Sequence, residues 1–317
     1  MLKKFLHHAT SFRRCTLVVA MALMTSLGVL SVASPAMAAP KGEYVVFADC
    51  PLSNASVVAC LVGRTESGEI TIGKQTVPIV NTQTLQGGLE EENPCNYPFQ
   101  GAGECRVPFV GAADGNTLSK TPQNVPGGLL NLIKCKEISN KYERAFCESI
   151  FEKGILGVNA TTELAVPASS IGLSESALFE PVLSEAFGIP ALKLPVKIKL
   201  ENQLLGNNCY IGSNSNPITL NLITGTTKPP EPNKPIKGKV GTLSSRAEGR
   251  ILVVSNNSLV DNSFAAPEAT GCGGSFSSVV DPIINAKLGL PSAAGHNTAI
   301  LNGTLEQTGA EAAREHE

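Results

Sequence analysis

The chain has 317 residues, of which 25 are Lys or Arg and 27 are Asp or Glu, so its formal net charge is −2. This length suffices for one large domain or two ordinary ones. The acidic balance argues against a nucleic-acid partner, because binding to nucleic acid requires a basic face. The absence of Trp and the presence of only four Tyr residues disfavour aromatic-lined carbohydrate clefts.

The first 38 residues have the three zones of a cleavable secretory signal peptide. The positive start contains Lys3, Lys4, Arg13 and Arg14. An apolar run over 17–32 follows, and an Ala-Met-Ala sequence predicts cleavage between Ala38 and Ala39. The alternative is an uncleaved anchor, but the run is shorter than the roughly 20 residues that span a bilayer. We expect a mature chain without a stable membrane span. Without the four cations it has 21 Lys and Arg against 27 Asp and Glu, a net charge of −6.

Cysteine usage predicts a disulfide framework. Cys15 lies in the signal peptide, so eight of the nine cysteines remain in the mature chain. An even number in an exported protein is typical of disulfides. Nearest-neighbour spacing favours the pairs Cys50–Cys60, Cys95–Cys105, Cys135–Cys147 and Cys209–Cys272. A zinc site is disfavoured because the chain has no C-x2-C pair.

Residues 39–157 are expected to form an N-terminal β part. The apolar runs at 44–48 and 57–62 are typical of strands. A turn at 66–69, followed by alternation at 70–72, predicts a hairpin.

A helical hairpin is predicted near 126–156. Residues 129–138 are apolar enough for a buried helix. The next helix begins with Asn140 and Glu143 in a capping-box-like arrangement and ends at Gly154. Its apolar face repeats every four residues, at Tyr142, Phe146 and Ile150. The Cys135–Cys147 pair would staple the two helices.

Residues 158–308 are expected to form an antiparallel β domain. The strands are predicted at 162–166, 194–201, 218–223, 249–254 and 299–305, and short helices at 174–187 and 279–288. In residues 194–201, Val196, Ile198 and Leu200 alternate with polar residues, which is typical of a half-buried strand. Residues 227–241 form a Pro- and Lys-rich loop, and residues 309–317 a flexible tail.

The elements together predict a mainly β fold: an antiparallel β-sandwich or barrel with a small disulfide-stapled helical insertion. Dense turn signals between short strands favour this class over a helical bundle.

Catalytic motifs are sparse. His296 is the one histidine expected within the folded part, and it lies in a turn-like stretch that predicts a surface loop. Paired carboxylates need no histidine. Asp261 and Asp281 flank a Gly-rich segment, but they more simply cap a turn and start a helix. The acidic run 90–92 is typical of a solvated loop. We predict no catalytic residue, no metal ligand and no cofactor.

Three further motifs are typical of binding or modification. Residues 68–74 match a phosphate-binding loop, but Gln75 replaces the Ser or Thr that contacts magnesium, and the interior alternates like a strand. Four lysines in the Pro-rich loop offer contacts to acidic envelope polymers, although a solvated spacer is the simpler interpretation: Lys228, Lys234, Lys237 and Lys239. N-glycosylation sequons begin at Asn54, Asn159, Asn256 and Asn302, and they matter only in a glycosylating host.

Three segments carry a family resemblance: 44–54, 192–227 and 259–274. They resemble a group of uncharacterised secreted proteins from actinobacteria, over most of the mature chain. The resemblance implies a bacterial, extracytoplasmic location, which would make the sequons irrelevant, and it implies no activity.

The sequence therefore favours a secreted or envelope-associated non-catalytic protein with a structural or surface-binding role. Its partner would be a cell-envelope polymer or another surface protein. The alternatives are a secreted hydrolase with paired carboxylates and an envelope pore, although the predicted strands are short for a pore.

Overall fold

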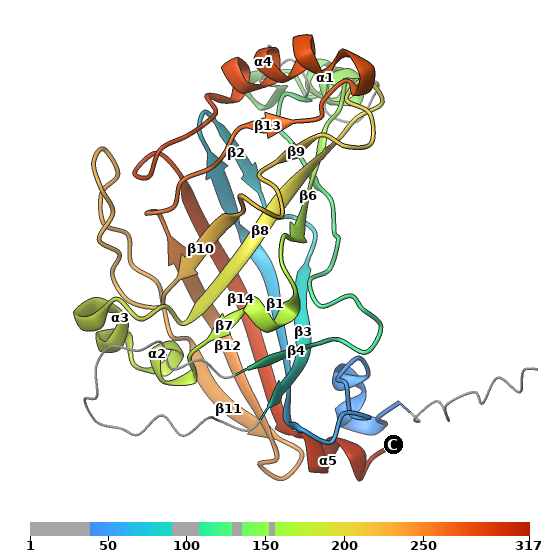
Figure 1. Cartoon of the computed structure of the whole chain (residues 1–317), viewed down its shortest axis with the longest axis vertical. Coiled ribbons are helices and arrows are strands. Elements are labelled where there is room, and N and C mark those ends of the chain that lie inside the picture. Colours follow the sequence, from blue (N-terminus) through green and yellow to red (C-terminus); the bar gives the residue numbers. More distant parts are fainter. Residues whose placement is uncertain (1–38, 91–107, 129–134, 152–155) are drawn as a thin grey trace, which may run out of the picture. The chain divides into compact units, whose positions relative to one another are not determined.

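The structure is a computed structural model that describes residues 39–90, 108–128, 135–151 and 156–317 (Figure 1). Residues 37–317 group as one compact unit. The described residues form two antiparallel sheets with short helices.

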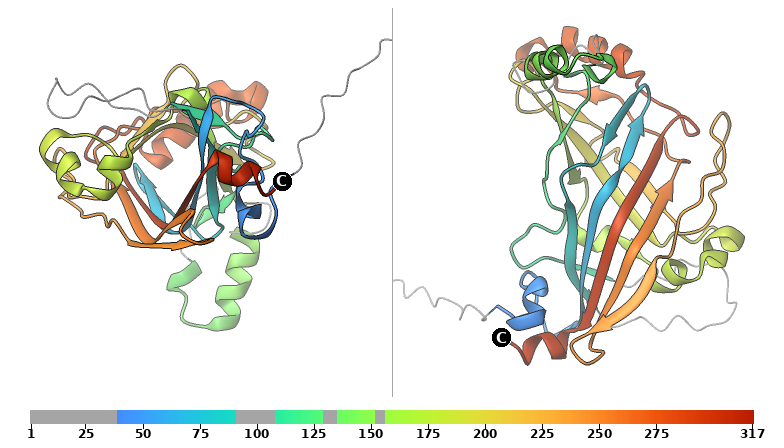
Figure 2. Two further views of the ribbon diagram at one scale, coloured as in Figure 1. Left: turned by 90° about the horizontal axis from the view of Figure 1, so that it is seen from below. Right: turned by 180° about the vertical axis from the view of Figure 1, so that it is seen from behind.

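Sheet A contains seven described strands in the order β11-β12-β14-β1-β3-β4, with β2 paired to β1. Their bounds are β1 Val57–Ile72, β2 Gln75–Pro78, β3 Gln83–Glu90, β4 Phe109–Gly111, β11 Thr242–Arg246, β12 Ile251–Asp261 and β14 Thr298–Gly309. Figure 2 shows the long strands β1, β14 and β12 side by side.

Sheet B is built around β8, which pairs with β6, β7, β9 and β10. Strands β5 and β13 extend it beyond β6 and β9. Its strands are β5 Gln123–Asn124, β6 Asn159–Leu164, β7 Gly172–Leu173, β8 Leu192–Glu201, β9 Tyr210–Ile211, β10 Ile218–Leu222 and β13 Ala269–Thr270.

Short helices surround the sheets in the described part. The α-helices are α1 Lys141–Phe151, α2 Glu175–Phe179, α3 Pro181–Phe187, α4 Ser277–Leu288 and α5 Ala310–Arg314. The 3-10 helices are η1 Gly42–Phe47, η3 Cys135–Glu137, η4 Ala168–Ser170 and η5 Gly274–Phe276. Figure 1 places α4 and α1 at one end of the sheets and α5 at the other.

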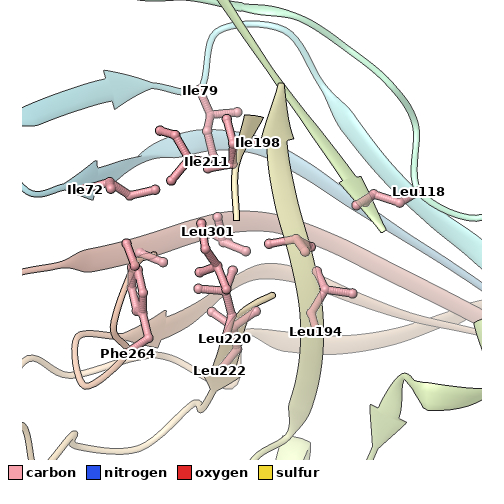
Figure 3. Packing of buried hydrophobic residues seen from close by; sticks show 14 of the residues in the cluster. Ile72, Ile79, Leu118, Leu194, Ile198, Ile211, Leu220, Leu222, Phe264 and Leu301 are labelled. Atoms are coloured by element: carbon pink, nitrogen blue, oxygen red, sulfur yellow. The ribbon is translucent and has the colours of Figure 1, made fainter. Parts of the chain in front are cut away.

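The main core lies between the two sheets (Figure 3). Leu301 of β14 and Ile72 of β1 come from sheet A, whereas Leu194 and Ile198 of β8 come from sheet B, and all four belong to one buried cluster. The fold is therefore mainly β, as predicted. Of the two predicted architectures, the sheets match the sandwich, because they do not close into a barrel.

A second core covers the outer face of sheet A. Phe47 of η1 and Ala310 and Ala313 of α5 pack there against Val62 of β1 and Ile251 of β12. The predicted flexible tail at 309–317 therefore contains a helix with two buried alanines.

The prediction of a strand at 44–48 was wrong, because these residues lie largely in η1. A helical turn buries Tyr44 and Phe47 together and leaves Val45 exposed. Packing in the second core thus overrides the strand propensity of this run.

The predicted turn at 66–69 was also wrong, because β1 runs through it with a bulge between Thr65 and Ser67. Gly68 allows this path with φ of +119°, and a Cβ there would lie 1.9 Å from the Ile300 carbonyl oxygen. The hairpin turn instead falls between β1 and β2, at Gly73 and Lys74. The phosphate-loop lookalike at 68–74 is therefore the end of a strand and its turn.

The predicted boundary between 157 and 158 does not separate two sheets. In sheet A, β1 pairs along its length with β14, which joins the N-terminal and C-terminal parts of the chain.

The helical insertion is described in part. Asn140 caps α1 by accepting from the Tyr142 amide, at 2.9 Å, as the sequence predicted. The predicted apolar face of α1 is exposed at Tyr142 and Phe146. Most of the helix predicted at 129–138, and Gly154, lie outside the described residues.

Candidate functional site

A cavity of about 80 Å³ lies between the two sheets, at the end where α4 packs. A single water needs roughly 10–15 Å³ on the same measure, so this space exceeds an ordinary packing gap. Its wall comes from β1, β2, β3, β5, β6, β8, β9 and α4.

The described wall of the cavity is mostly apolar. Its apolar residues are Ile70, Ile72, Val77, Ile79, Val125, Val158, Ala160, Ile198, Leu200, Leu205, Ile211, Ile284 and Leu288. Figure 3 shows four of them, Ile72, Ile79, Ile198 and Ile211, gathered from both sheets. For the wall residues of β8, the alternation of side chains along the strand explains the placement. Ile198 and Leu200 face inward, whereas Lys197 and Lys199 face outward.

Helix α4 is fixed over this end by polar contacts to β13 and to the two residues that follow it. The Asp281 carboxylate accepts from the backbone amides of Gly271, at 3.1 Å, and Cys272, at 2.7 Å. The Asn285 side chain bonds both backbone groups of Ala269, at 2.7 and 3.0 Å. Ile284 and Leu288 on the same helix thereby line the cavity.

The Cys209–Cys272 disulfide ties the same region together. Cys209 directly precedes β9, and Cys272 follows β13 with only Gly271 between them. Strands β9 and β13 pair with each other. The bond therefore links both strands beneath α4.

Gln123 supports the wall on the β5 side. Its side-chain oxygen accepts from the amides of Val80 and Asn81, at 2.9 and 3.0 Å. Its nitrogen donates to the Asn81 carbonyl oxygen, at 2.6 Å. Through these three hydrogen bonds, the Gln123 side chain holds the segment after β2 against β5.

Gln83 and Thr162 also line the cavity, at 8% and 7% exposure. Gln83 begins β3 in sheet A, and Thr162 lies within β6 in sheet B. Within the described ranges, neither side chain makes a hydrogen bond.

Three of the four predicted disulfides are confirmed: Cys50–Cys60, Cys135–Cys147 and Cys209–Cys272. Cys95 and Cys105 lie outside the described residues. The three bonds indicate an oxidising environment. The predicted cleavage site adjoins the first described residue, Ala39, and Ala38 lies outside the description.

The candidate carboxylates have structural contacts. Asp261 is 2% exposed and accepts from the amides of Asn221, at 2.7 Å, and Ser263, at 2.8 Å. Burial raises its pKa, although both hydrogen bonds oppose the shift. The Ser263 contact is the turn cap that the sequence predicted. Asp281 lies inside α4 and not at its start, which is a correction.

The other predicted residues lie away from the cavity. His296 is exposed, as expected for a loop. Glu90 accepts from the Ser56 hydroxyl, at 2.7 Å, whereas Glu91 and Glu92 lie outside the described residues. The four loop lysines are exposed, and the loop itself is held by bridges between Thr226 and Lys237 and between Lys239 and Ser258.

Across the described ranges, no three His, Cys, Asp or Glu side chains group closely enough to hold a metal ion. None of the helices in those ranges combines the length and apolar character that a bilayer crossing requires.

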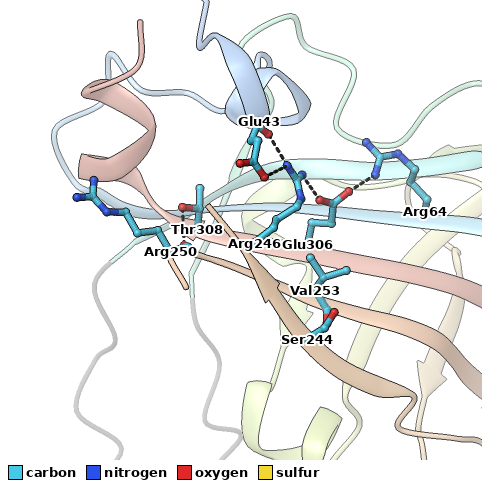
Figure 4. Close-up of polar contacts among 8 residues, drawn as sticks. All are labelled: Glu43, Arg64, Ser244, Arg246, Arg250, Val253, Glu306 and Thr308. Atoms are coloured by element: carbon cyan, nitrogen blue, oxygen red, sulfur yellow. Dashed lines mark hydrogen bonds and ion pairs between the residues drawn. The ribbon is translucent and has the colours of Figure 1, made fainter. Parts of the chain in front are cut away.

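A charged cluster that the sequence did not predict lies on sheet A (Figure 4). Glu306 of β14 pairs with Arg64 of β1 at 2.6 Å, and also with Arg246 of β11. Arg246 also donates to the Glu43 carbonyl oxygen of η1, at 2.7 Å. The cluster therefore fastens η1 to the outer face of the sheet.

Comparisons of the chain with protein-family models, with curated proteins and with solved structures each found no match.

Proposed function

We propose that this chain is an exported, non-catalytic protein that binds a small apolar ligand in the cavity between its sheets. Export rests on the signal-peptide pattern, with its predicted cleavage before Ala39, and on the resemblance to secreted actinobacterial proteins. The three disulfides support an extracytoplasmic location.

The observation that carries the proposal is the apolar cavity of about 80 Å³. Protein interiors normally pack without voids larger than a water molecule. A mostly apolar space is a candidate site for an apolar molecule, because an apolar cavity of about 150 Å³ takes up benzene. Concave sites with an apolar lining and a few polar groups are the usual form of ligand pockets.

A hydrolase with paired carboxylates receives no specific support. Each of the two candidates, Asp261 and Asp281, accepts two backbone amide hydrogen bonds, and neither lines the cavity. A role at the cell surface, with an envelope polymer or another surface protein as the partner, is compatible with ligand binding and stays part of the proposal.

The test is a titration of the mature protein with naphthalene, an apolar fluorophore without a hydrogen-bonding group. We expect saturable binding that Ala160→Leu weakens about tenfold, or ~1.4 kcal/mol, because the added carbons occupy the cavity. Filling the space should not lower the melting temperature of this variant.

Asn159→Leu is the matched control, since it places the same side chain on the exposed face of the same strand. Its naphthalene affinity should equal that of the wild type. Absence of saturable binding to the wild type, or equal weakening in both variants, would refute the proposal.

A further inference from the structure

Two polar side chains in the cavity wall stand apart from the other polar groups there. Gln83 and Thr162 are each more than nine-tenths buried and line the cavity. No hydrogen bond to either side chain is present in the part of the chain that the structure describes. Gln123, in the same wall, satisfies its amide with three backbone groups.

Buried polar side chains in folded proteins nearly always have a hydrogen-bond partner. Among the described residues, the fully buried side-chain atom without one is Asn262 Oδ1, so the polar atoms of Gln83 and Thr162 keep some accessible surface. Their hydrogen-bonding capacity is therefore open to a ligand with a complementary polar group. The two residues come from opposite sheets, Gln83 from β3 and Thr162 from β6. A ligand between the sheets can therefore meet both.

The charge of the wall limits the polar group that fits. Among the described residues that line the cavity, none is acidic, and the cation Lys287 has an interaction partner of its own. The Gln83 amide donates and accepts, and so does the Thr162 hydroxyl. Neutral groups of this kind match a neutral hydroxyl or carbonyl. An ionised group would lose its hydration beside them, and a carboxylate could recover that loss only at Lys287, which already has a partner.

Building on the ligand binding proposed above, we propose that the occupant is an uncharged amphiphile: an apolar chain or ring with one hydroxyl or carbonyl group. That group bonds to the Gln83 amide and the Thr162 hydroxyl. The apolar part lies among residues such as Ile198, Leu200 and Ile284.

The experiment compares octan-1-ol with octanoate at pH 7.5, each displacing naphthalene from the mature protein. We expect the alcohol to bind at least about tenfold more tightly than the carboxylate. Thr162→Val and Gln83→Met should each weaken octan-1-ol about fivefold or more and leave naphthalene affinity unchanged, because the hydrocarbon makes no hydrogen bond.

The controls are neighbours on the same strands whose side chains point away from the cavity. Thr161→Val removes a hydroxyl that donates to Glu201, at 2.7 Å, and Gln86→Met removes an amide that donates to Asp49, at 3.1 Å. Neither control should change octan-1-ol affinity. Thr162→Val should melt no lower than the wild type, whereas Thr161→Val should melt lower, since it loses an existing hydrogen bond.

The outcomes separate the two proposals. If naphthalene binds but octanoate equals or exceeds octan-1-ol, the neutral-amphiphile inference is overturned and apolar binding stands. If naphthalene binds and the alcohol keeps its affinity in both Thr162→Val and Gln83→Met, the inference is likewise overturned. If naphthalene does not bind to the wild type, both proposals fall.

Discussion

Glu306 on β14 is 7% exposed, and its carboxylate lies between the guanidinium groups of Arg64 and Arg246. Burial opposes its ionisation, but the hydrogen bonds from Arg246 and Arg64 outweigh burial and lower its pKa below the usual value. A carboxylate with a lowered folded-state pKa stabilises the fold above its unfolded-state pKa. That contribution is lost as the pH falls through the folded-state pKa.

Glu306→Gln should therefore lower the free energy of unfolding at pH 7 by about 1–3 kcal/mol, because it leaves two partly buried arginines without their partner. The measurement is urea unfolding at pH 7 and at pH 3. The difference from the wild type should shrink at pH 3. Glu66→Gln, at an exposed position, serves as the control, and its free energy of unfolding should differ little from that of the wild type at either pH. An equal Glu306→Gln difference at both pH values contradicts this explanation.

At the scale of residues, the sequence predicted the disulfide pairs well, because separations of 10 and 12 residues leave each cysteine with one close neighbour. It did not identify Gln83 or Thr162 as site residues. Both are ordinary polar residues in strands, and their significance depends on missing hydrogen-bond partners, which a sequence does not display.

Helix α5 is the element that differs most from expectation, because the sequence predicted a flexible tail there. Arg314 donates to the carbonyl oxygens of Leu52, at 3.0 Å, and of Asn54 and Val57, each at 3.1 Å. These contacts fasten the C-terminal helix to the segment that leads into β1.

Arg314→Met should lower the free energy of unfolding by about 1–3 kcal/mol, since three carbonyl groups lose a charged donor. Urea unfolding measures this loss. Glu315→Gln is the control: it breaks an exposed pair with Arg250, at 2.8 Å, and should change the stability far less than Arg314→Met does. Equal stability of Arg314→Met and the wild type would mean that the tail is frayed after all.

The Cys209–Cys272 disulfide acts at the element scale because it joins β9 and β13 beneath α4. The double variant Cys209→Ala, Cys272→Ala should lose about 2–4 kcal/mol of stability and bind naphthalene more weakly. Thermal melting and the same titration measure both effects.

The matched control is Cys50→Ala, Cys60→Ala, which removes a disulfide from the second core. It should also be less stable but should keep its naphthalene affinity. If the two double variants bind equally well, the disulfide next to α4 has no special part in forming the cavity.

Elements with a clear period were predictable. In β8, Val196, Ile198 and Leu200 are buried while Lys197 and Lys199 are less so, as the alternation indicated. The failures have physical causes outside the local pattern. Residues 44–48 follow the second core into a helix, and β1 passes 66–69 because of Gly68 and a bulge.

At the scale of the whole described unit, the sequence predicted a mainly β fold but not the pairing of strands from its two ends. The pairing of β1 with β14 joins segments more than 200 residues apart, and no local signal reports such a pairing. The cavity was unpredictable for the same reason, because its wall combines eight elements from both sheets.

Ligand binding should also raise the stability of the whole unit, because a molecule that binds only the folded state shifts the unfolding equilibrium. Octan-1-ol at about 100 times its dissociation constant should add about 2.7 kcal/mol. The melting temperature of the wild type should rise accordingly, and that of Ala160→Leu should rise only about half as much at the same alcohol concentration, because its binding is about tenfold weaker. An equal rise in both proteins would mean that the alcohol acts elsewhere than in the cavity.

The most direct measurement is a crystal structure of the mature protein grown with octan-1-ol. We predict density for the alkyl chain between the sheets near Ile198 and Ile284, with its oxygen at hydrogen-bond distance from Thr162 or Gln83. A cavity that stays empty at saturating alcohol, or that side chains fill in the crystal, would contradict the claim that this protein carries an apolar ligand between its sheets.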